Sequence, residues 1–191
     1  MKILIINASP RRNGTVDTML DIACSALEKK NVAVEKIFVN NLNIKYCTGC
    51  MACREKGDCI LPEDDGHMIA RKINECDGLI IGSPVYWGNI PGSLKVMFDR
   101  IVYVMMGENS VNYPVPKQKG KKALILTACT TNKIGDFFAG ESKGAQKALK
   151  EILSYSGFGI VGKLNRNNTK NKHLISDKLK RKIIARSGKL I

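Results

Sequence analysis

The sequence predicts an α/β fold, in which a doubly wound sheet of five parallel strands lies between two layers of helices. The first observation is that the chain holds short, continuous apolar runs. Lys2–Asn7 is one, and its β-branched residues are typical of a strand buried on both faces. The second observation is that helical patterns alternate with these runs. The third is that no repeat or linker divides the 191 residues, so we expect residues 1–191 to form a single domain.

Strand and helix patterns alternate along the whole chain. The first helix is the clearest, because Met19, Leu20 and Ala23 recur at helical spacing. The predicted strands are Lys2–Asn7, Val32–Val39, Asp77–Ser83, Lys121–Cys129 and Phe158–Leu164. The predicted helices are Thr15–Lys30, Glu63–Cys76, Pro91–Met106, Glu141–Ser156 and Ser176–Ser187. Asn109–Lys119 holds two prolines and no periodicity, and we expect a loop there.

The net charge of +14 belongs to the C-terminal part of the chain. Residues 1–116 hold 13 basic and 13 acidic residues (13 − 13 = 0), whereas residues 117–191 hold 18 and 4 (18 − 4 = +14). A basic surface attracts nucleic acids, phosphates and acidic proteins. The basic part lacks the interleaved aromatic residues of a single-strand binding surface, so we expect solvated helix faces and no nucleic-acid partner.

The chain has seven cysteines and no recognisable secretory signal or membrane-spanning run. Cysteines in a chain without a signal favour metal binding or redox chemistry over disulfides. We therefore expect a reducing, cytoplasmic location. Cys24, Cys76 and Cys129 fall on helical or apolar patterns and are expected to fill the core.

The remaining four cysteines crowd into residues 43–62; they are Cys47, Cys50, Cys53 and Cys59. The first three follow one another at C-x2-C spacing, and the fourth comes after five further residues. In a compact loop this spacing can turn the sulfurs toward one centre, and Gly49 and Gly57 provide the backbone freedom. Four soft thiolates suit an iron–sulfur cluster or zinc.

The spacing favours a [4Fe-4S] cluster over zinc, because structural zinc sites usually pair two C-x2-C units that are far apart in sequence. The run is similar to the start of a bacterial ferredoxin motif, although the fourth cysteine arrives after five residues and the proline waits until Pro62. Reduced thiols or a redox-active pair without metal remain the alternative.

Doubly wound sheets bind ligands beyond the carboxyl ends of their strands, and this rule selects three loops. In the first, Ala8–Thr15, hydroxyls, backbone amides that include that of Gly14, and the helix N-terminus can hold a phosphate, with charge from Arg11 or Arg12. The loop has neither the G-x-G-x-x-G of a dinucleotide site nor the G-K-[ST] of a nucleoside-triphosphate site.

The second and third loops are suited to a flat ring. Ser83–Pro91 holds Tyr86 beside Trp87, the only tryptophan of the chain, and its amides could read the polar edge of a heterocycle. Thr127–Asn132, which includes Cys129, is small and polar, as a close approach to a ring requires. A phosphate site beside a ring site indicates a mononucleotide.

Three motifs carry a resemblance to a known family: Ser9-Pro10-Arg11, Ser83-Pro84-Val85-Tyr86-Trp87-Gly88-Asn89, and Lys95-x-x-Phe98-Asp99-Arg100. Together they resemble the flavodoxin-like NADPH-dependent FMN reductase superfamily. The cysteine spacing is similar to that of the iron–sulfur flavoproteins within it. The resemblance covers about residues 1–130. It implies strand order 2-1-3-4-5, one FMN per subunit, a [4Fe-4S] cluster, and a homodimer or homotetramer with a cluster near a neighbour's flavin.

The resemblance also implies roles for individual residues. Ser9, Arg11, Asn13 and Thr15 would hold the FMN phosphate. The isoalloxazine would be lined by Pro84, Val85, Tyr86, Trp87, Gly88 and Asn89. Thr127 and Cys129 of the third loop, which the sheet topology selects, are expected at the same cofactor. Where many relatives end the phosphate loop with Asn-Thr, this chain has Thr15-Val16, so the phosphate would depend more on Arg11 and backbone amides.

A protein with these two cofactors would convert between two-electron and one-electron chemistry. We therefore expect an electron-transfer flavoprotein, with NAD(P)H as a possible reductant and an acidic carrier such as ferredoxin as a possible partner. The alternative is a cluster-free NAD(P)H-dependent reductase of FMN, quinones or nitro compounds. No side chain is expected to act as a general acid or base, and His67 and His173 are expected to be satisfied or exposed.

Overall fold

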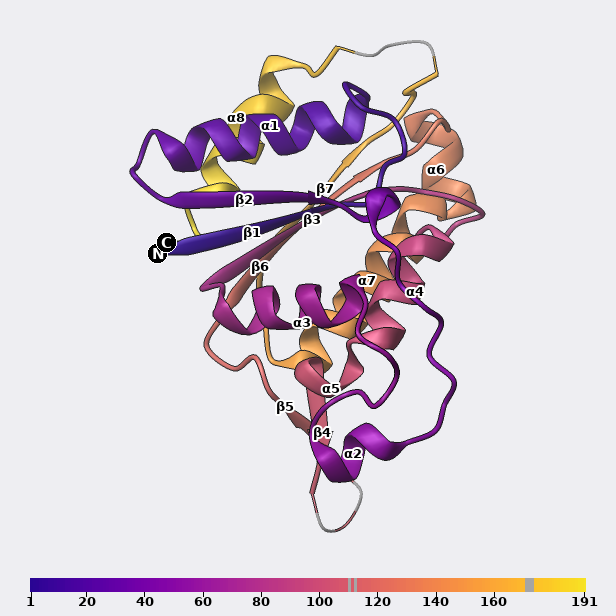
Figure 1. The fold of residues 1–191 in the computed structure, drawn as a ribbon. Coiled ribbons are helices and arrows are strands. Elements are labelled where there is room, and N and C mark those ends of the chain that lie inside the picture. Colours follow the sequence, from indigo (N-terminus) through magenta and orange to yellow (C-terminus); the bar gives the residue numbers. More distant parts are fainter. Residues whose placement is uncertain (110, 112, 171–173) are drawn as a thin grey trace.

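Five parallel strands form the centre of the computed structural model (Figure 1), which describes residues 1–109, 111, 113–170 and 174–191. The strands of this sheet are β1 (Lys2–Asn7), β2 (Ala33–Phe38), β3 (Gly78–Pro84), β6 (Lys122–Ala128) and β7 (Gly159–Arg166). They are ordered β2-β1-β3-β6-β7, and each neighbouring pair is parallel. The predicted three-layer α/β/α fold with a parallel sheet of five strands is confirmed.

The last two strands of this sheet are β6 and β7, where the expected order 2-1-3-4-5 has strands 4 and 5. The numbering differs because two further strands lie between β3 and β6 in the sequence. These are β4 (Met106–Glu108) and β5 (Pro114–Pro116), which form a separate antiparallel pair. The prediction of a loop over Asn109–Lys119 was wrong for β5. Three-residue strands are too short to display alternation, and proline is tolerated where a strand has a free edge. The expected loop also includes residues 110 and 112, which lie outside the described residues.

Helices cover both faces of the sheet (Figure 1). One face carries α1 (Thr15–Glu28) and α8 (Asp177–Ser187), and the other carries α3 (Asp65–Glu75), α4 (Gly92–Arg100), α5 (Val102–Met105) and α7 (Glu141–Ser156). Successive residues of β1 point to opposite faces, so Ile3 and Ile5 pack with α1 while Leu4 and Ile6 pack with α3 and α4. All four side chains are fully buried, and each such burial stabilises the fold by about 1.5–3 kcal/mol.

Local structure differs from the sequence predictions at several points. The single helix expected over Pro91–Met106 is divided into α4 and α5, because Ile101 (φ −102°, ψ 16°) leaves the helical conformation. The cysteine loop contains a short helix, α2 (Ala52–Lys56), and a second, α6 (Lys133–Ala139), precedes α7. Both are too short for a periodic apolar pattern to emerge. A 3-10 turn, η1 (Val39–Asn41), follows β2.

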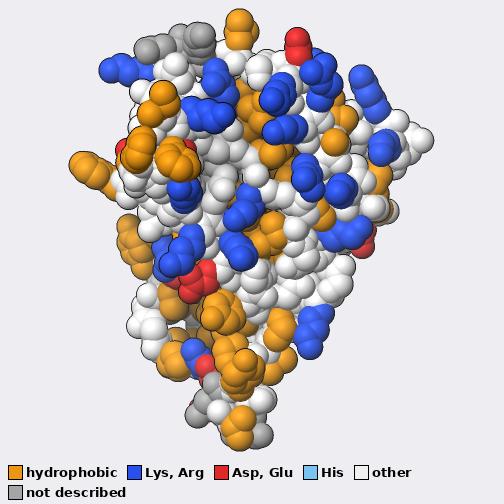
Figure 2. All heavy atoms as spheres, turned by 180° about the vertical axis from the view of Figure 1, so that it is seen from behind, with side chains coloured by type: hydrophobic (Ala, Val, Ile, Leu, Met, Phe, Trp, Pro, Cys, Tyr) orange, Lys and Arg blue, Asp and Glu red, His pale blue; other side chains and the backbone are white. Residues whose placement is uncertain are grey.

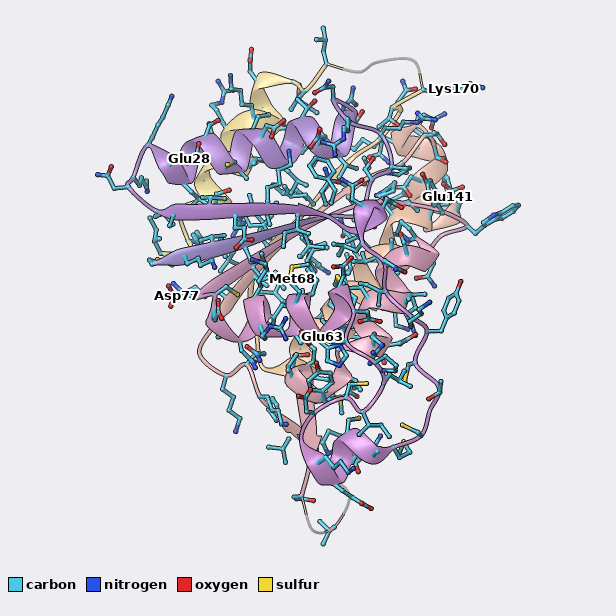
Figure 3. The ribbon with its side chains drawn as sticks, in the orientation of Figure 1. Glu28, Glu63, Met68, Asp77, Glu141 and Lys170 are labelled. Carbon is cyan, nitrogen blue, oxygen red and sulfur yellow. The ribbon has the colours of Figure 1, made fainter. Side chains whose placement is uncertain are left out.

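The carboxyl ends of all five strands meet at one edge of the sheet. In Figure 3, Glu141 at the start of α7 lies at this edge, whereas Asp77, just before β3, lies at the opposite edge near both chain termini. No helix in the described part of the chain is both long and apolar enough to span a membrane. His173 lies outside the described residues.

Candidate functional site

The three loops selected from the sequence are joined to one another by backbone hydrogen bonds. The N–H of Ala8, in the first loop, donates to the carbonyl of Gly82 over 2.8 Å, which connects it to the end of β3. The N–H of Val85, in the second loop, donates to the carbonyl of Ala128 over 2.9 Å, which connects it to the third. The predicted phosphate loop and ring loops therefore form one continuous rim along the carboxyl edge of the sheet.

The phosphate loop is organised around Ser9, which is only 6% exposed. Its hydroxyl accepts a hydrogen bond from the N–H of Arg11 over 3.2 Å. Asn13 has a left-handed backbone (φ 57°), and Gly14 forms the N-cap of α1 without a side-chain hydrogen bond to the helix. The N–H groups of the first turn of α1 thus have no side-chain cap, and they offer donors and a helix N-terminus to an anion.

Asp17 supports this loop from below and was not singled out in the sequence. Its buried carboxylate accepts from the Nδ2 of Asn7 and from the N–H of Asn13, both over 2.8 Å, and it pairs with Lys36. The two arginines of the loop differ. The Arg12 guanidinium lies 4.4 Å from the ring centre of Phe38, whereas Arg11 is exposed and can turn toward a phosphate.

The second loop ends in a tight turn. The N–H groups of Tyr86 and Asn89 each donate to the other's carbonyl over 2.9 Å, and the two central residues, Trp87 and Gly88, have φ values of 52° and 70°. These are the left-handed values of a type I′ turn, where Asn-Gly is the usual pair. The Trp87 side chain is fully exposed. An exposed tryptophan held in a costly backbone conformation favours a role in contacting a ligand.

The third loop contributes differently from what was predicted. Thr127 is fully buried, and its hydroxyl contacts Asn165 Oδ1 at 2.9 Å and Gln146 Nε2 at 3.0 Å. The thiol of Cys129 is 2% exposed and accepts from the Nδ2 of Asn167 over 3.2 Å. Burial raises the pKa of Cys129, so this thiol is protonated. Neither side chain faces solvent, so the structure places both beneath the rim, where they support its backbone.

The four cysteines of the 43–62 segment line one cavity of about 60 Å³. The backbone turns needed for this are made by left-handed residues: Gly49 (φ 69°), Met51 (φ 63°) and Gly57 (φ 72°). The last two cap α2, which carries Cys53. The predicted use of Gly49 and Gly57 as flexible backbone positions is therefore confirmed, and Met51 is a third such position that sequence reasoning missed.

The chemistry of this cavity is that of crowded thiols. Burial, and then the nearby sulfurs of Cys59, Cys47 and Cys50, raise the pKa of Cys53, whereas a hydrogen bond from the N–H of Ala52 lowers the pKa of Cys50. Thiolates that repel one another are stabilised by a cationic metal centre, so the donor set fits an iron–sulfur cluster. Within the described ranges, however, no three His, Cys, Asp or Glu side chains are close enough to hold a metal ion as they stand.

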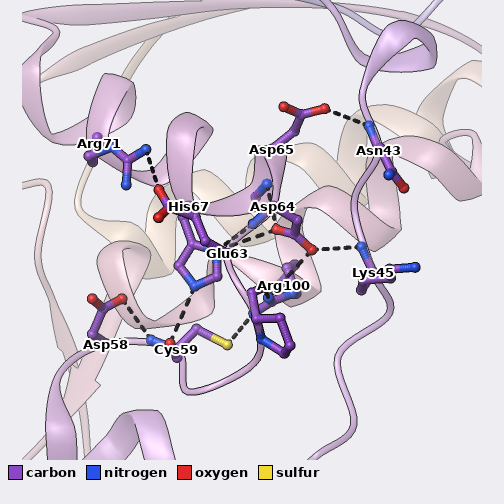
Figure 4. Close-up of polar contacts among 12 residues, drawn as sticks. Asn43, Lys45, Asp58, Cys59, Glu63, Asp64, Asp65, His67, Arg71 and Arg100 are labelled. Carbon is purple, nitrogen blue, oxygen red and sulfur yellow. Dashed lines mark hydrogen bonds and ion pairs between the residues drawn. The ribbon is translucent and has the colours of Figure 1, made fainter.

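Residues at the start of α3 fix both ends of the cysteine segment (Figure 4). Near its N-terminal end, the N–H of Lys45 donates to Asp64 Oδ2 over 2.9 Å. Near its C-terminal end, the Nε2 of His67 lies 3.3 Å from the carbonyl oxygen of Cys59. The Nδ1 of His67 accepts from the N–H of Asp64 over 3.2 Å, which completes a capping box. His67 is buried with both ring nitrogens satisfied, as predicted.

A groove of about 930 Å³ connects the two candidate sites. Its lining includes Asn89 and Ile90 of the second loop as well as Cys47 and Gly49 of the cysteine segment. Apolar side chains from α4 and α5, among them Phe98 and Met105, also line this groove. The ring loop and the cysteine loop therefore open onto the same depression, although about 40 residues separate them in sequence.

Proteins with similar sequences were found among curated flavoproteins. An iron-sulfur flavoprotein of Clostridioides difficile is 28% identical over 100% of this chain and 78% of its own length. Iron-sulfur flavoproteins of Archaeoglobus fulgidus and Methanosarcina thermophila are 39% and 34% identical, in each case over 53% of this chain. The matches cover 46% and 53% of those two relatives, so this chain spans about half of their length.

Solved structures with the same fold are more distant in sequence. An FMN-dependent NADH-azoreductase from Bacillus anthracis in complex with FMN has a TM-score of 0.77 at 15% identity, over 99% of this chain and 98% of that one. An NAD(P)H:quinone oxidoreductase from Methanothermobacter marburgensis has a TM-score of 0.72 at 16% identity, over 99% and 94%. Both likenesses concern the fold.

The family assignment depends on the sequence match, which extends over residues 1–165 and is to NADPH-dependent FMN reductase. This region contains β1 through α7, all three rim loops and the cysteine segment. The resemblance predicted from the motifs is confirmed, and the chain belongs to the NADPH-dependent FMN reductase family of oxidoreductases.

Proposed function

We propose that the protein binds one FMN at the rim of the sheet and passes electrons between this flavin and a [4Fe-4S] cluster on the cysteine segment. The single observation that carries the proposal is the groove lined both by Asn89 and Ile90 and by Cys47 and Gly49. It brings a candidate flavin site and a four-cysteine cavity onto one surface. Electron transfer between two cofactors requires such proximity.

The phosphate of FMN would be held by Ser9, Arg11, Asn13, Thr15 and the uncapped N–H groups of α1, including the segment around Gly14. Asp17 would keep the loop in shape through its bond to the N–H of Asn13. The ring would lie against the Pro84–Asn89 loop, with Trp87 and Tyr86 supplying apolar surface. Cys47, Cys50, Cys53 and Cys59 would hold the cluster, after a small closure that brings their sulfurs together.

The two groups differ in the electrons they exchange: FMN accepts two electrons and releases them singly, and a [4Fe-4S] cluster accepts one. The protein would bind and orient both groups. Reduced nicotinamide, NADPH or NADH, is the proposed source of electrons. An acidic carrier such as ferredoxin is the proposed acceptor, and the lysines and arginines gathered on the rear face in Figure 2 suit it.

The experiment that tests this is anaerobic purification followed by assays of iron, acid-labile sulfide and released flavin on one sample. About four irons and four sulfides per chain, together with one FMN, are the expected result, since that is the composition of a [4Fe-4S] cluster. Flavin without iron, even after anaerobic reconstitution with iron and sulfide, would overturn the cluster. Absence of flavin would overturn the whole proposal.

A cluster-free NAD(P)H-dependent reductase of FMN, quinones or nitro compounds is the second candidate. The observation that favours it is the lack of three converging ligand side chains in the described residues. It requires that an iron-free preparation oxidise NADPH rapidly, whereas the first proposal predicts slow oxidation that reconstitution accelerates. In either case we propose a homo-oligomer and, from the seven free cysteines, a reducing cytoplasmic location.

A further inference from the structure

Arg100, the last residue of α4, lies under the cysteine cavity and is only 2% exposed. Taking a guanidinium out of water is costly unless other charges and hydrogen bonds compensate for it. A buried guanidinium therefore needs neighbouring groups that interact favourably with its positive charge. The contacts of Arg100 therefore indicate what its charge acts on.

Arg100 contacts a cysteine sulfur: its Nη1 donates to the Sγ of Cys59 (Figure 4), and both residues line the cysteine cavity. Its Nη2 lies 3.5 Å from the carbonyl oxygen of Pro62 and 3.5 Å from Asp64 Oδ2. Its Nε has no hydrogen-bond partner among the described residues. Asp64 makes shorter bonds elsewhere, to the N–H groups of Lys45 and Gly66. The positive charge of Arg100 is thus only partly offset by Asp64, and it is directed toward the cysteines.

The other charged residues that line the cavity are solvated. The side chain of Arg54 is 40% exposed and pairs with Glu108, and that of Asp99 is 46% exposed and pairs with Lys95 at 2.6 Å. Exposed charges are screened by water and salt, so they act weakly on a neighbouring site. Among the described residues that line the cavity, Arg100 is the one buried cation.

We propose that Arg100 is a positioning residue that raises the reduction potential of the cluster and keeps Cys59 as its ligand. This inference rests on the proposed function. When the cluster is reduced it takes one electron, from the flavin in the protein or from dithionite in a titration, and no bond is broken. The site gains one negative charge, and a fixed cation beside the Cys59 sulfur stabilises the more negative state.

The test is a mediated redox titration of the anaerobically reconstituted protein, followed by the cluster's electron paramagnetic resonance signal. Arg100→Met removes the charge and keeps much of the side-chain length, and we expect a more negative potential and faster loss of iron to a chelator. Arg100→Lys keeps the charge but loses the guanidinium fork, and we expect an intermediate potential. Arg54→Met is the matched control, because it removes an exposed cation from the same cavity, and its potential should stay near that of the wild type.

Asp64→Asn should shift the reduction potential of the cluster in the opposite direction from Arg100→Met. This test does not require the Arg100 variants to fold. Asparagine is as good an N-cap as aspartate, so α3 keeps its start, although the N–H of Lys45 loses an acceptor. Removing the anion that partly offsets Arg100 should make the cluster potential more positive. A purely structural role would not produce shifts of opposite sign. The FMN content of each variant shows whether its sheet and rim have folded.

The outcomes separate the two proposals. If the wild type holds cluster and FMN but the potentials of Arg100→Met and Arg54→Met are equal, the role of Arg100 is overturned and the proposed function is retained. Shifts of the same sign in Arg100→Met and Asp64→Asn would also overturn it. If the wild type binds no iron or sulfide after reconstitution, the cluster and the role of Arg100 are both overturned.

Discussion

Gly144 on α7 touches the carbonyl oxygen of Gly88 so closely that a Cβ at position 144 would overlap with it. Gly88 belongs to the tight turn that presents Trp87 and that is closed by the paired bonds of Tyr86 and Asn89. Gly144 is therefore the position at which α7 contacts the Tyr86–Asn89 turn and limits how closely the two can approach. Nothing in the helical pattern of the sequence distinguished this glycine.

The first prediction is that Gly144→Ala weakens FMN binding. The added methyl group must push the Tyr86–Asn89 turn away from α7, which moves the proposed ring-binding surface. We expect the affinity of the flavin-free protein for FMN to fall by about tenfold or more, which corresponds to roughly 1.4 kcal/mol. Titration with FMN, followed by quenching of flavin fluorescence, measures it.

Gly159→Ala is the matched control for this substitution. A Cβ at Gly159 would have its nearest neighbour, the carbonyl oxygen of Lys121, at an ordinary 3.8 Å. Its FMN affinity should equal that of the wild type. Equal affinities for Gly144→Ala and Gly159→Ala would mean that the ring loop does not contact the flavin.

The second prediction concerns Trp87, whose left-handed backbone suits asparagine better than tryptophan. In the flavin-free protein, Trp87→Asn should raise the free energy of unfolding by about 0.5–1 kcal/mol, because the strain of the turn is relieved. The same change should lower FMN affinity by about tenfold, because an aromatic contact of roughly 1–1.5 kcal/mol is lost. Urea unfolding and flavin titration on one preparation measure the two effects.

Tyr113→Asn, which removes an aromatic side chain that is 70% exposed on the segment before β5, should change neither quantity. If Trp87→Asn stabilises the protein and leaves FMN affinity unchanged, the tryptophan is not a flavin contact. A loss of both stability and affinity would instead indicate that Trp87 supports the turn itself.

The sheet could be predicted because its signals are local. A run such as Lys2–Asn7 carries its own burial pattern, and alternation with helices then leaves few possible topologies. The rim loops followed from that topology, since the carboxyl ends of parallel strands share an edge. The four cysteines could be grouped because they are close in sequence.

The residues that complete the site could not be predicted, because their roles depend on contacts between distant segments. Arg100 meets Cys59 across 41 positions of sequence, and Thr127 is satisfied by Asn165 across 38. Thr127 and Cys129 were expected at the ring because their loop is small and polar. Nothing local reveals that Asn165 and Asn167 approach from β7 and its end, and bury both side chains. Gly144 was missed for the same reason.

The third prediction separates the four cysteines of the cavity from the rest. Cys50→Ser and Cys59→Ser should each abolish cluster assembly, because a hydroxyl is a poor substitute for a thiolate ligand. Cys24→Ser is the control. Burial raises the pKa of Cys24 to about 11, so that thiol stays protonated at neutral pH and is not available as a ligand. Iron and sulfide per FMN should be unchanged in this variant. Loss of iron in all three variants alike would mean that cluster loss reflects general instability.

The last prediction concerns Asp136, which joins α6 to the start of α7 beneath the rim. Its carboxylate, 7% exposed, accepts from the N–H of Ser142 and from the Nδ2 of Asn167, both over 2.8 Å, and from the Ser142 hydroxyl. Burial acts to raise the pKa of Asp136, but the bonds from Ser142 and Asn167 outweigh it, so the pKa lies below its ordinary value of 3.8.

The sign of the pH dependence follows from this depressed pKa. The ionised carboxylate stabilises the fold fully above pH 3.8, and this contribution is lost as the pH falls from there through the folded-state pKa, because the unfolded chain takes up the proton first. Asp136→Asn should lower the free energy of unfolding by about 1–3 kcal/mol at neutral pH, since donors of Ser142 and Asn167 lose their acceptor.

The difference in the free energy of unfolding between Asp136→Asn and the wild type should therefore become smaller as the pH is lowered below 3.8. Urea unfolding at a series of pH values measures it. Asp21→Asn is the control, because the Asp21 side chain is 56% exposed and its pair with Lys36 is worth little in water. If the stability of Asp136→Asn runs parallel to that of the wild type at every pH, then Asp136 is not the acid-sensitive contact. In that case the contacts that hold the rim at its α6 end include the backbone bonds between residues 129–131 and 166–169 and the bond from Asn167 to the Cys129 sulfur.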